Sequence, residues 1–162
     1  MEYYCCSIKT TQDEFWIIWF SNSTTGVLTD QGSNVLVFNS RTATEDFLSR
    51  KNTQLTYGET IFDFAMLEVA ADHSYFDFED FDQALSFYNF LQDIANSLGM
   101  DVLNGETIDS AYQKLFLGSN LPSVTPRGSE QFPVLTETEQ KTLFSELKRL
   151  LHGFLSRRTW VT

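Results

Sequence analysis

Lysine and arginine are absent from the sequence between Lys51 and Lys114, although that stretch carries twelve carboxylates. The rest of the 162-residue chain is nearly neutral, with ten acids against eleven bases. The formal net charge of −11 therefore comes from the middle third of the chain. A surface of negative sign repels nucleic acid and anionic lipid and attracts basic proteins, although acidic residues also serve solubility alone. We therefore expect a basic protein partner, and no binding to nucleic acid or membrane.

Cysteine is nearly absent too, and the two that occur, Cys5 and Cys6, are neighbours. A disulfide between adjacent residues is strained, and two cysteines are too few for a metal site. On a strand their side chains point to opposite faces, where reduced thiols pack as small apolar groups. The N-terminus has no basic leader, and its longest apolar run, FWIIWF, is far too short to span a bilayer. These features predict a cytoplasmic protein.

The residues that most enzymes use for catalysis are scarce in this sequence. It contains only two histidines, and the GxSxG, CxxC and HExxH patterns are missing. The glycines are isolated from one another, so no glycine-rich loop is available to bind a phosphate. The sequence therefore predicts a protein that is not an enzyme and that holds no cofactor or metal.

One acidic segment, which reads DHSYFDFEDFDQALSFYNF from Asp72 onwards, is the strongest candidate for a cation site. His73 lies beside Asp72 and near Asp77, but surface histidines among carboxylates are usually not ligands. A calcium loop counted from Asp77 fails, because position 6 is Asp82 instead of glycine and position 12 is Tyr88 instead of glutamate. We therefore predict no metal site in this segment.

Short runs of aromatic and β-branched residues predict a sheet near the N-terminal end. EYYCCSIK (2–9) and EFWIIWF (14–20) are joined by the polar connection TTQD, which is typical of an antiparallel pair. Both faces of the second run are apolar, which places it centrally in the sheet. VLVF (35–38) predicts a third strand, and QLTY (54–57) is a further candidate.

Capping patterns and apolar periodicity predict the first helices. Thr42 and Glu45 form a capping pattern for a short helix, and residues 60–72 favour a strand followed by a turn. Apolar residues at three- and four-residue spacing predict a long helix over residues 80–98, which Gly99 ends.

Two more helices are expected in the C-terminal part of the chain. A short helix is predicted over residues 107–117, followed by a long loop over 118–133 that holds all three prolines. Thr136 and Glu139 then form a capping box in front of a continuous apolar stripe. We therefore predict a single α+β domain over residues 1–162, with an N-terminal antiparallel sheet packed against several helices.

The long predicted helix suggests a surface for binding a partner. Its buried face should centre on Tyr88, and at about 100° per residue Phe90 falls on the opposite, outward side. Glu79, Asp82 and Asp93 fall on that outward side too, so Phe90 would be an exposed anchor ringed by charge. The alternatives are a scattered surface aromatic or one that the long loop covers. The candidate partner-binding residues are Asp72, Asp77, Glu79, Asp82, Phe90 and Asp93.

The acidic run DFEDFD with its following helix, and the C-terminal pattern FPVLTETEQKTLFSELKRLL, belong to a small acidic chain that is rich in aromatic residues. In this overall character the sequence resembles the immunity proteins of bacterial polymorphic toxins, including those of contact-dependent growth inhibition systems. The resemblance implies a non-enzymatic protein that neutralises a basic toxin domain, such as a nuclease, by blocking its active or substrate-binding surface. It includes no family motif, so no functional residue is transferred from it.

A second hypothesis is a small cytosolic enzyme or ligand-binding protein, with a pocket between the helices and the aromatic sheet. Trp16, Trp19, Tyr3 or Tyr4 would line such a pocket, although strand aromatics more often pack into a core. A mimic of DNA is a third hypothesis, but it needs acids spread over a larger surface than one segment. The binding protein remains the preferred interpretation.

Overall fold

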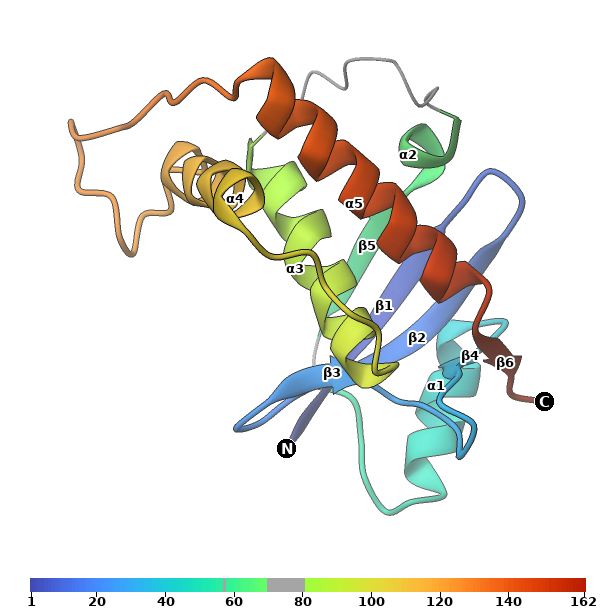
Figure 1. Cartoon of the computed structure of the whole chain (residues 1–162). Helices are drawn as coiled ribbons and strands as arrows, with labels where there is room; N and C mark the ends of the chain where they lie inside the picture. The colour runs from blue at the N-terminus through green and yellow to red at the C-terminus, as the bar shows by residue number, and fades with distance from the viewer. Residues whose placement is uncertain (57, 70–80) are drawn as a thin grey trace.

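The computed structural model describes residues 1–56, 58–69 and 81–162, and a four-stranded sheet lies at its centre (Figure 1). In spatial order the strands are β3 (Thr25–Val27), β2 (Glu14–Ser21), β1 (Glu2–Lys9) and β5 (Glu59–Asp63). β1 and β2 are antiparallel, as predicted, and β3, which the sequence did not predict, is antiparallel to β2. However, β5 pairs in parallel with β1, so the sheet as a whole is mixed.

The parallel position of β5 depends on a long connection. Parallel neighbours cannot be joined by a tight turn, and here the chain passes through α1 (Arg41–Ser49) between β1 and β5. The strand predicted at the start of 60–72 is confirmed as β5, and the short helix α2 (Ala65–Val69) follows it. Residues 54–56 form no strand, although the Thr56 amide donates a 2.6 Å hydrogen bond to the Tyr3 carbonyl.

A second, two-stranded sheet joins an early strand to the C-terminal end of the chain. It consists of β4 (Val35–Val37), which the sequence predicts, and β6 (Arg158–Trp160), which it does not, in parallel. The Thr159 hydroxyl donates a 2.6 Å hydrogen bond to Asp30 Oδ2 just before β4. Together with donors from Asn34, this bond lowers the pKa of Asp30 to about 2, so the connection is held by an ionised carboxylate.

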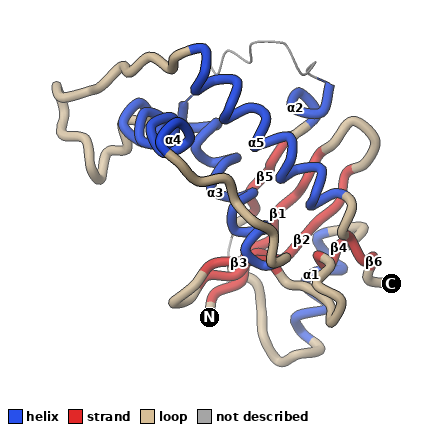
Figure 2. Tube along the Cα trace, viewed as in Figure 1, coloured by secondary structure: helices blue, strands red, loops and turns tan. Residues whose placement is uncertain are grey.

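Helices lie on both faces of the large sheet (Figures 1 and 2). On one face lie α3 (Phe81–Ser97), α4 (Glu106–Gly118) and α5 (Glu137–Leu155), close to their predicted bounds. On the other face lies α1, so the chain forms one α+β fold, as predicted. No helix in the part of the chain that the structure describes is long and apolar enough to cross a membrane.

The N-terminal cap of α5 is the predicted one, whereas the cap of α1 differs from the prediction. Thr136 and Glu139 form the predicted capping box at the start of α5. The start of α1 lies earlier than predicted, because Ser40 is its N-cap and accepts a hydrogen bond from the Ala43 amide. Thr44 and Leu48, one helical turn apart in α1, are both buried.

The central strand β2 is buried on both faces, as its apolar sequence predicts. Phe15 and Ile17 belong to the larger core beneath α3, α4 and α5. Ile18 faces the other way and packs with Phe38 and Leu48 in a smaller core beneath α1. Two cores of unequal size therefore share this one strand.

The adjacent cysteines divide between the two faces in the same way. Cys6 belongs to the larger core, whereas Cys5 lies 3.6 Å from the Thr44 hydroxyl on α1. Both thiols are free and buried. Burial raises the pKa of both, that of Cys6 to about 12, so they remain protonated at neutral pH. They act as small core residues, as expected.

Candidate functional site

The predicted partner-binding residues do not form one surface in the structure. Outside the described residues lie Asp72, Asp77 and Glu79. Asp82 is exposed in the first turn of α3. Phe90 and Asp93 lie about one turn apart in the same helix, and both contact the sheet. The structure therefore brings two of the six residues together.

The prediction that Phe90 is an exposed anchor is wrong. Its side chain is only 5% exposed, and its ring stacks on Phe62 of β5 with 3.7 Å between the ring centroids. Phe87 also packs towards Phe62, whereas Tyr88 packs on Tyr112 of α4. The helix α3 is thus covered by the sheet on one side and by α4 on the other, while α5 packs beside it and reaches the sheet through Phe154. Phe90 does lie away from Tyr88, but both sides are buried.

Asp93 ties α3 to the sheet. Its Oδ2 atom accepts a 2.9 Å hydrogen bond from the Trp19 indole on β2, and its Oδ1 atom accepts a 2.6 Å bond from the Thr25 hydroxyl. One turn later, the Ser97 hydroxyl accepts a 3.0 Å bond from the Val27 amide on β3. The donors to Asp93 are uncharged, so among the described residues this carboxylate holds the helix in place through hydrogen bonds and not through an ion pair.

A pocket with a volume of 270 Å³ opens beside Asp93, between α3 and the strands β1, β2 and β5. The lining residues are Cys6, Trp19, Thr60, Phe62, Ser86, Asn89, Phe90 and Asp93. Aromatic rings supply much of the apolar lining, while the hydroxyl, amide and carboxylate groups come from β5 and α3. Because β5 is the last strand in the sheet order, no further described strand pairs along its outer edge.

The sequence contained part of the signal for this pocket. Helical spacing predicts that Ser86 and Asp93 share a side of α3 with Phe90, and they do line one pocket. The sequence did not indicate that β5 would cover this side of α3. The alternation along β5 places Thr60 and Phe62 towards the helix, yet nothing in the local pattern indicates that β5 would lie beside β1 and beneath α3.

The strand aromatics named as alternative pocket-lining residues take different positions. Trp19 lines the pocket, and the ring of Tyr4 packs against the ring of Trp19 with 5.2 Å between their centroids. Trp16 and Tyr3 pack on the smaller core at the opposite face, where the Trp16 indole donates a 2.8 Å hydrogen bond to Glu59. An aromatic pocket on the helix side of the sheet is therefore present.

The buried carboxylate Glu139 joins α4 to α5. It accepts hydrogen bonds from Lys114 Nζ at 2.7 Å, from the Ser110 hydroxyl at 2.6 Å and from the Thr136 amide at 2.7 Å. Burial by itself raises the pKa of this carboxyl, but the donors outweigh burial and lower the pKa of Glu139 to about 2. Its hydrogen bonds serve to link the two helices.

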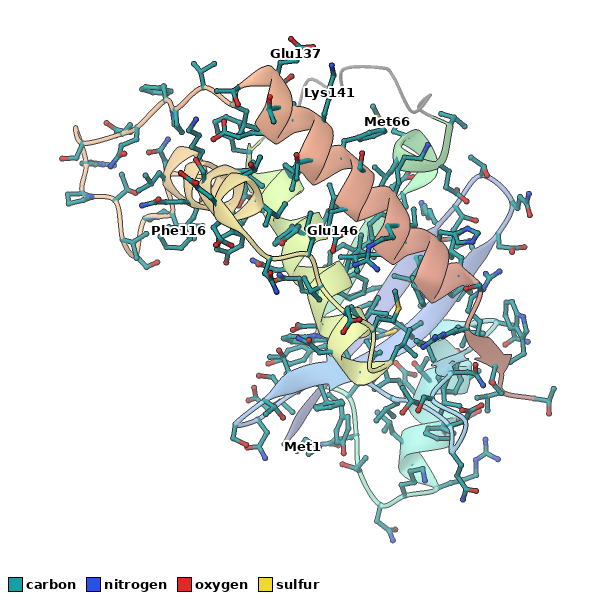
Figure 3. All side chains as sticks on the ribbon, viewed as in Figure 1. Met1, Met66, Phe116, Glu137, Lys141 and Glu146 are labelled. Carbon is teal, nitrogen blue, oxygen red and sulfur yellow. The ribbon has the colours of Figure 1, made fainter. Side chains whose placement is uncertain are left out.

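Glu146, labelled in Figure 3, makes a comparable link from α5 to the segment before α4. Arg149 donates two 2.7 Å hydrogen bonds to this carboxylate, and the Leu103 amide donates a third at 2.8 Å. Burial acts to raise the pKa of Glu146, but the hydrogen bonds from Arg149 and from the Leu103 amide lower it by more. The pKa of Glu146 therefore lies below its ordinary value. These donors satisfy the buried carboxylate, which therefore has a structural role.

The described residues contain no cluster of three or more histidine, cysteine, aspartate or glutamate side chains suited to holding a metal ion. His152 is exposed on α5 and shares a pocket of 220 Å³ with Lys148 and Glu68. The other candidate trio, His73 with Asp72 and Asp77, lies outside the described residues.

The long loop predicted over 118–133 is confirmed between the end of α4 and the start of α5. Asn120 closes its base, because its amide side chain both donates to the Gln131 carbonyl at 2.8 Å and accepts from the Gln131 amide at 2.7 Å. Phe132 and Val134 lie beyond this closure and are 84% and 78% exposed. In Figure 1 the loop extends away from the helices, which makes it a second possible contact surface.

No protein-family model and no curated protein matches the sequence. The fold is similar to a crystal structure of the SatS C-terminal domain in complex with bromine, with a TM-score of 0.54. The match covers 98% of this chain and 94% of that domain, at 16% sequence identity. At that identity the likeness supports a shared α+β architecture over the whole chain and says nothing about function.

Proposed function

We propose that this protein is a non-enzymatic binding protein that neutralises a basic protein partner, most consistent with a toxin domain such as a nuclease. The observation that carries the proposal is the stretch between Lys51 and Lys114, which has twelve carboxylates and no lysine or arginine. Charge of one sign confined to part of a surface speeds association with a basic partner and orients it on approach. A partner that binds nucleic acid has a surface of the matching sign.

The described carboxylates of this stretch support the proposal because uncharged groups hold several of them. Asp63 accepts from the Ala65 amide, and Glu68 accepts from the Thr11 amide. Such bonds fix a carboxylate without neutralising it, as they do for Asp93. Exposed around the start of α4 are Asp101, Glu106 and Asp109. The negative field thus extends from α2 to α4.

The proposal places the protein in the cytoplasm, where its buried thiols remain reduced. We expect its gene to lie beside one that encodes a toxin domain. Co-expression of the chain should restore growth to cells that produce this toxin domain. The purified pair should bind with a Kd on the order of nanomolar, weakening as NaCl rises from about 50 to about 500 mM. An adjacent toxin domain that remains fully toxic in the presence of the chain would contradict the proposal.

The pocket beside Asp93 favours a second candidate function, a protein that binds a small ligand. Its combination of aromatic lining and a few polar groups is common to sites for small molecules, although 270 Å³ lies just below their usual range of about 300–1,000 Å³. Such a function predicts that the protein retains a small molecule through purification.

A further inference from the structure

We propose that the pocket between β5 and α3 receives an arginine side chain of the basic partner protein. This inference rests on the proposed function and names the point at which the partner is anchored. It is carried by four features of the pocket: its aromatic lining, the carboxylate of Asp93, its uncharged polar rim and its position at the sheet edge.

The lining suits the long stem and flat head of arginine. Phe62 and Phe90, whose rings stack on one another, line the pocket together with Trp19 of β2. Methylene groups of a basic side chain pack on such rings while the charged head stays close to water. A guanidinium also stacks on aromatic faces, which a compact ammonium does less well.

Asp93 is the only charged residue among the described residues that line the pocket. The Trp19 indole and the Thr25 hydroxyl each donate to one of its oxygens, so the carboxylate is fixed before any ligand arrives. Each carboxylate oxygen has a second lone pair, which leaves room for two further donors. A guanidinium presents parallel N–H groups that match such a pair of oxygens.

The rim supplies acceptors for the remaining guanidinium donors. Ser86, Asn89 and Thr60 are exposed at the pocket, and their side chains make no hydrogen bond to another residue in the described part of the chain. Arginine has five N–H donors, so a pocket with several acceptors around one carboxylate favours it over lysine. A volume of 270 Å³ accommodates one long side chain with a few waters.

The position of the pocket makes it accessible to a folded partner. It opens between the edge strand β5 and the exposed residues Ser86 and Asn89 of α3. Both elements belong to the stretch of sequence without lysine or arginine. Arg41 does pair with Glu59 at the start of β5, but the described residues that line the pocket include no lysine or arginine. A negative field raises the local concentration of a basic group. Arginine is also enriched among the residues that dominate binding energy at protein interfaces.

The test is an NMR titration of the full-length, ¹⁵N-labelled chain with N-acetyl-arginine methylamide. We expect the assigned Trp19 indole signal to shift and saturate at millimolar concentrations of this probe. The citrulline analogue, which is uncharged and nearly the same shape, should bind at least about tenfold more weakly. Equal binding of the two compounds, or no shift of the Trp19 signal, would overturn the proposal.

Two variants connect the pocket to the partner. S86Y places a ring over the pocket mouth from an exposed position, so it should abolish the arginine shift and weaken binding of the toxin domain at least tenfold. N96Y is the matched control, because Asn96 is exposed on the same helix and does not line the pocket. D93N should also abolish the shift, and its backbone amide spectrum reports whether the fold is intact.

The outcomes separate this inference from the proposed function. Salt-sensitive binding of the toxin domain that S86Y leaves unchanged would overturn the pocket inference and leave the function standing. An arginine shift in a protein that protects against no toxin domain would contradict the function while showing that the pocket selects guanidinium. A small molecule found in the pocket of the purified protein by native mass spectrometry would overturn the inference in favour of ligand binding.

Discussion

Phe90 lies where α3 meets the edge strand β5, and its ring stacks on Phe62 at a centroid distance of 3.7 Å. Phe64 and Phe87 continue the same cluster, with their rings 4.7 Å apart. Stacked and tilted aromatic pairs contribute about 0.5–1.5 kcal/mol beyond the burial of their area. Phe90 therefore stabilises the fold, and its effect on a partner is indirect, through the shape of the pocket.

Replacement of Phe90 by alanine should lower the free energy of unfolding by about 3–5 kcal/mol, because it leaves a cavity beside Phe62. Urea unfolding followed by circular dichroism measures the change. Phe132→Ala is the matched control, since Phe132 is 84% exposed, and should change stability by less than about 0.5 kcal/mol. If Phe90→Ala were as stable as the native chain, the ring could not be packed as described.

Single residues differ in how far sequence predicts their surroundings. Cys5 and Cys6 were predicted to point to opposite faces, and they do, because alternation along a strand depends only on the backbone. The cap of α1 was predicted at Thr42 but lies at Ser40. Both residue types are good caps, so local preference alone does not choose between them, and in the structure the Ser40 hydroxyl accepts from the Ala43 amide.

At the scale of elements, Glu139 links α4 to the start of α5 through three hydrogen bonds. Lys114 and Ser110 donate to it from α4, and the Thr136 amide donates from the cap of α5. The carboxyl has a folded-state pKa of about 2 against an ordinary value of 4.5. A lowered folded pKa means that this contribution to stability is complete above about pH 4.5. It is lost as pH falls towards 2.

Replacement of Glu139 by glutamine should cost about 1–3 kcal/mol of unfolding free energy at pH 7, because the amide leaves at least one donor without an acceptor. The difference between the two chains should shrink below about pH 4.5, because the glutamate of the unfolded chain then binds a proton that the folded chain, with a pKa of about 2, does not. Chemical unfolding at pH 7 and pH 3 measures it.

Glu137→Gln is the control for this experiment. It lies in the same first turn, but its ion pair with Lys141 is at the surface, so its replacement should cost less than about 0.5 kcal/mol. A Glu139→Gln penalty of the same size at both pH values would mean that ionisation of Glu139 does not stabilise the link between the helices.

Elements that depend on local chemistry were predicted well. The capping box at Thr136 and Glu139 needs only four residues, and the structure contains it. The partner of β5 was not predictable, because a parallel pairing joins segments far apart in sequence through α1. The pocket depends on that pairing. The sequence therefore predicted the pocket residues that α3 contributes, but not those that β5 contributes.

At the scale of the whole molecule, the charge distribution is the property most closely tied to the proposed function. Long-range attraction acts on the rate of association, whereas short-range contacts act mainly on dissociation. Asp93 is bonded to Trp19 and Thr25, so its replacement also disturbs the fold. A clean test of charge therefore uses the other acids.

Neutralising Asp77, Glu79 and Asp82 together should slow association with the toxin domain by roughly threefold to tenfold at low salt. Dissociation should change little, and surface plasmon resonance separates the two rates. The control set is Asp46, Glu130 and Glu137, which are exposed acids outside the basic-free stretch. If both triple variants slow association equally, net charge alone steers the partner and the middle third has no special role.

By itself the sequence determined the α+β class, the three C-terminal helices, the central position of β2 and the place of the excess charge. These follow from periodicity, capping and composition, which are properties of neighbouring residues. Only the tertiary structure decided that α3 is covered on two sides, that Phe90 is buried and that Asp93 stands at a pocket. The helical period fixes how side chains are spaced around the helix axis. Which side of the helix contacts another element depends on how segments distant in sequence pack.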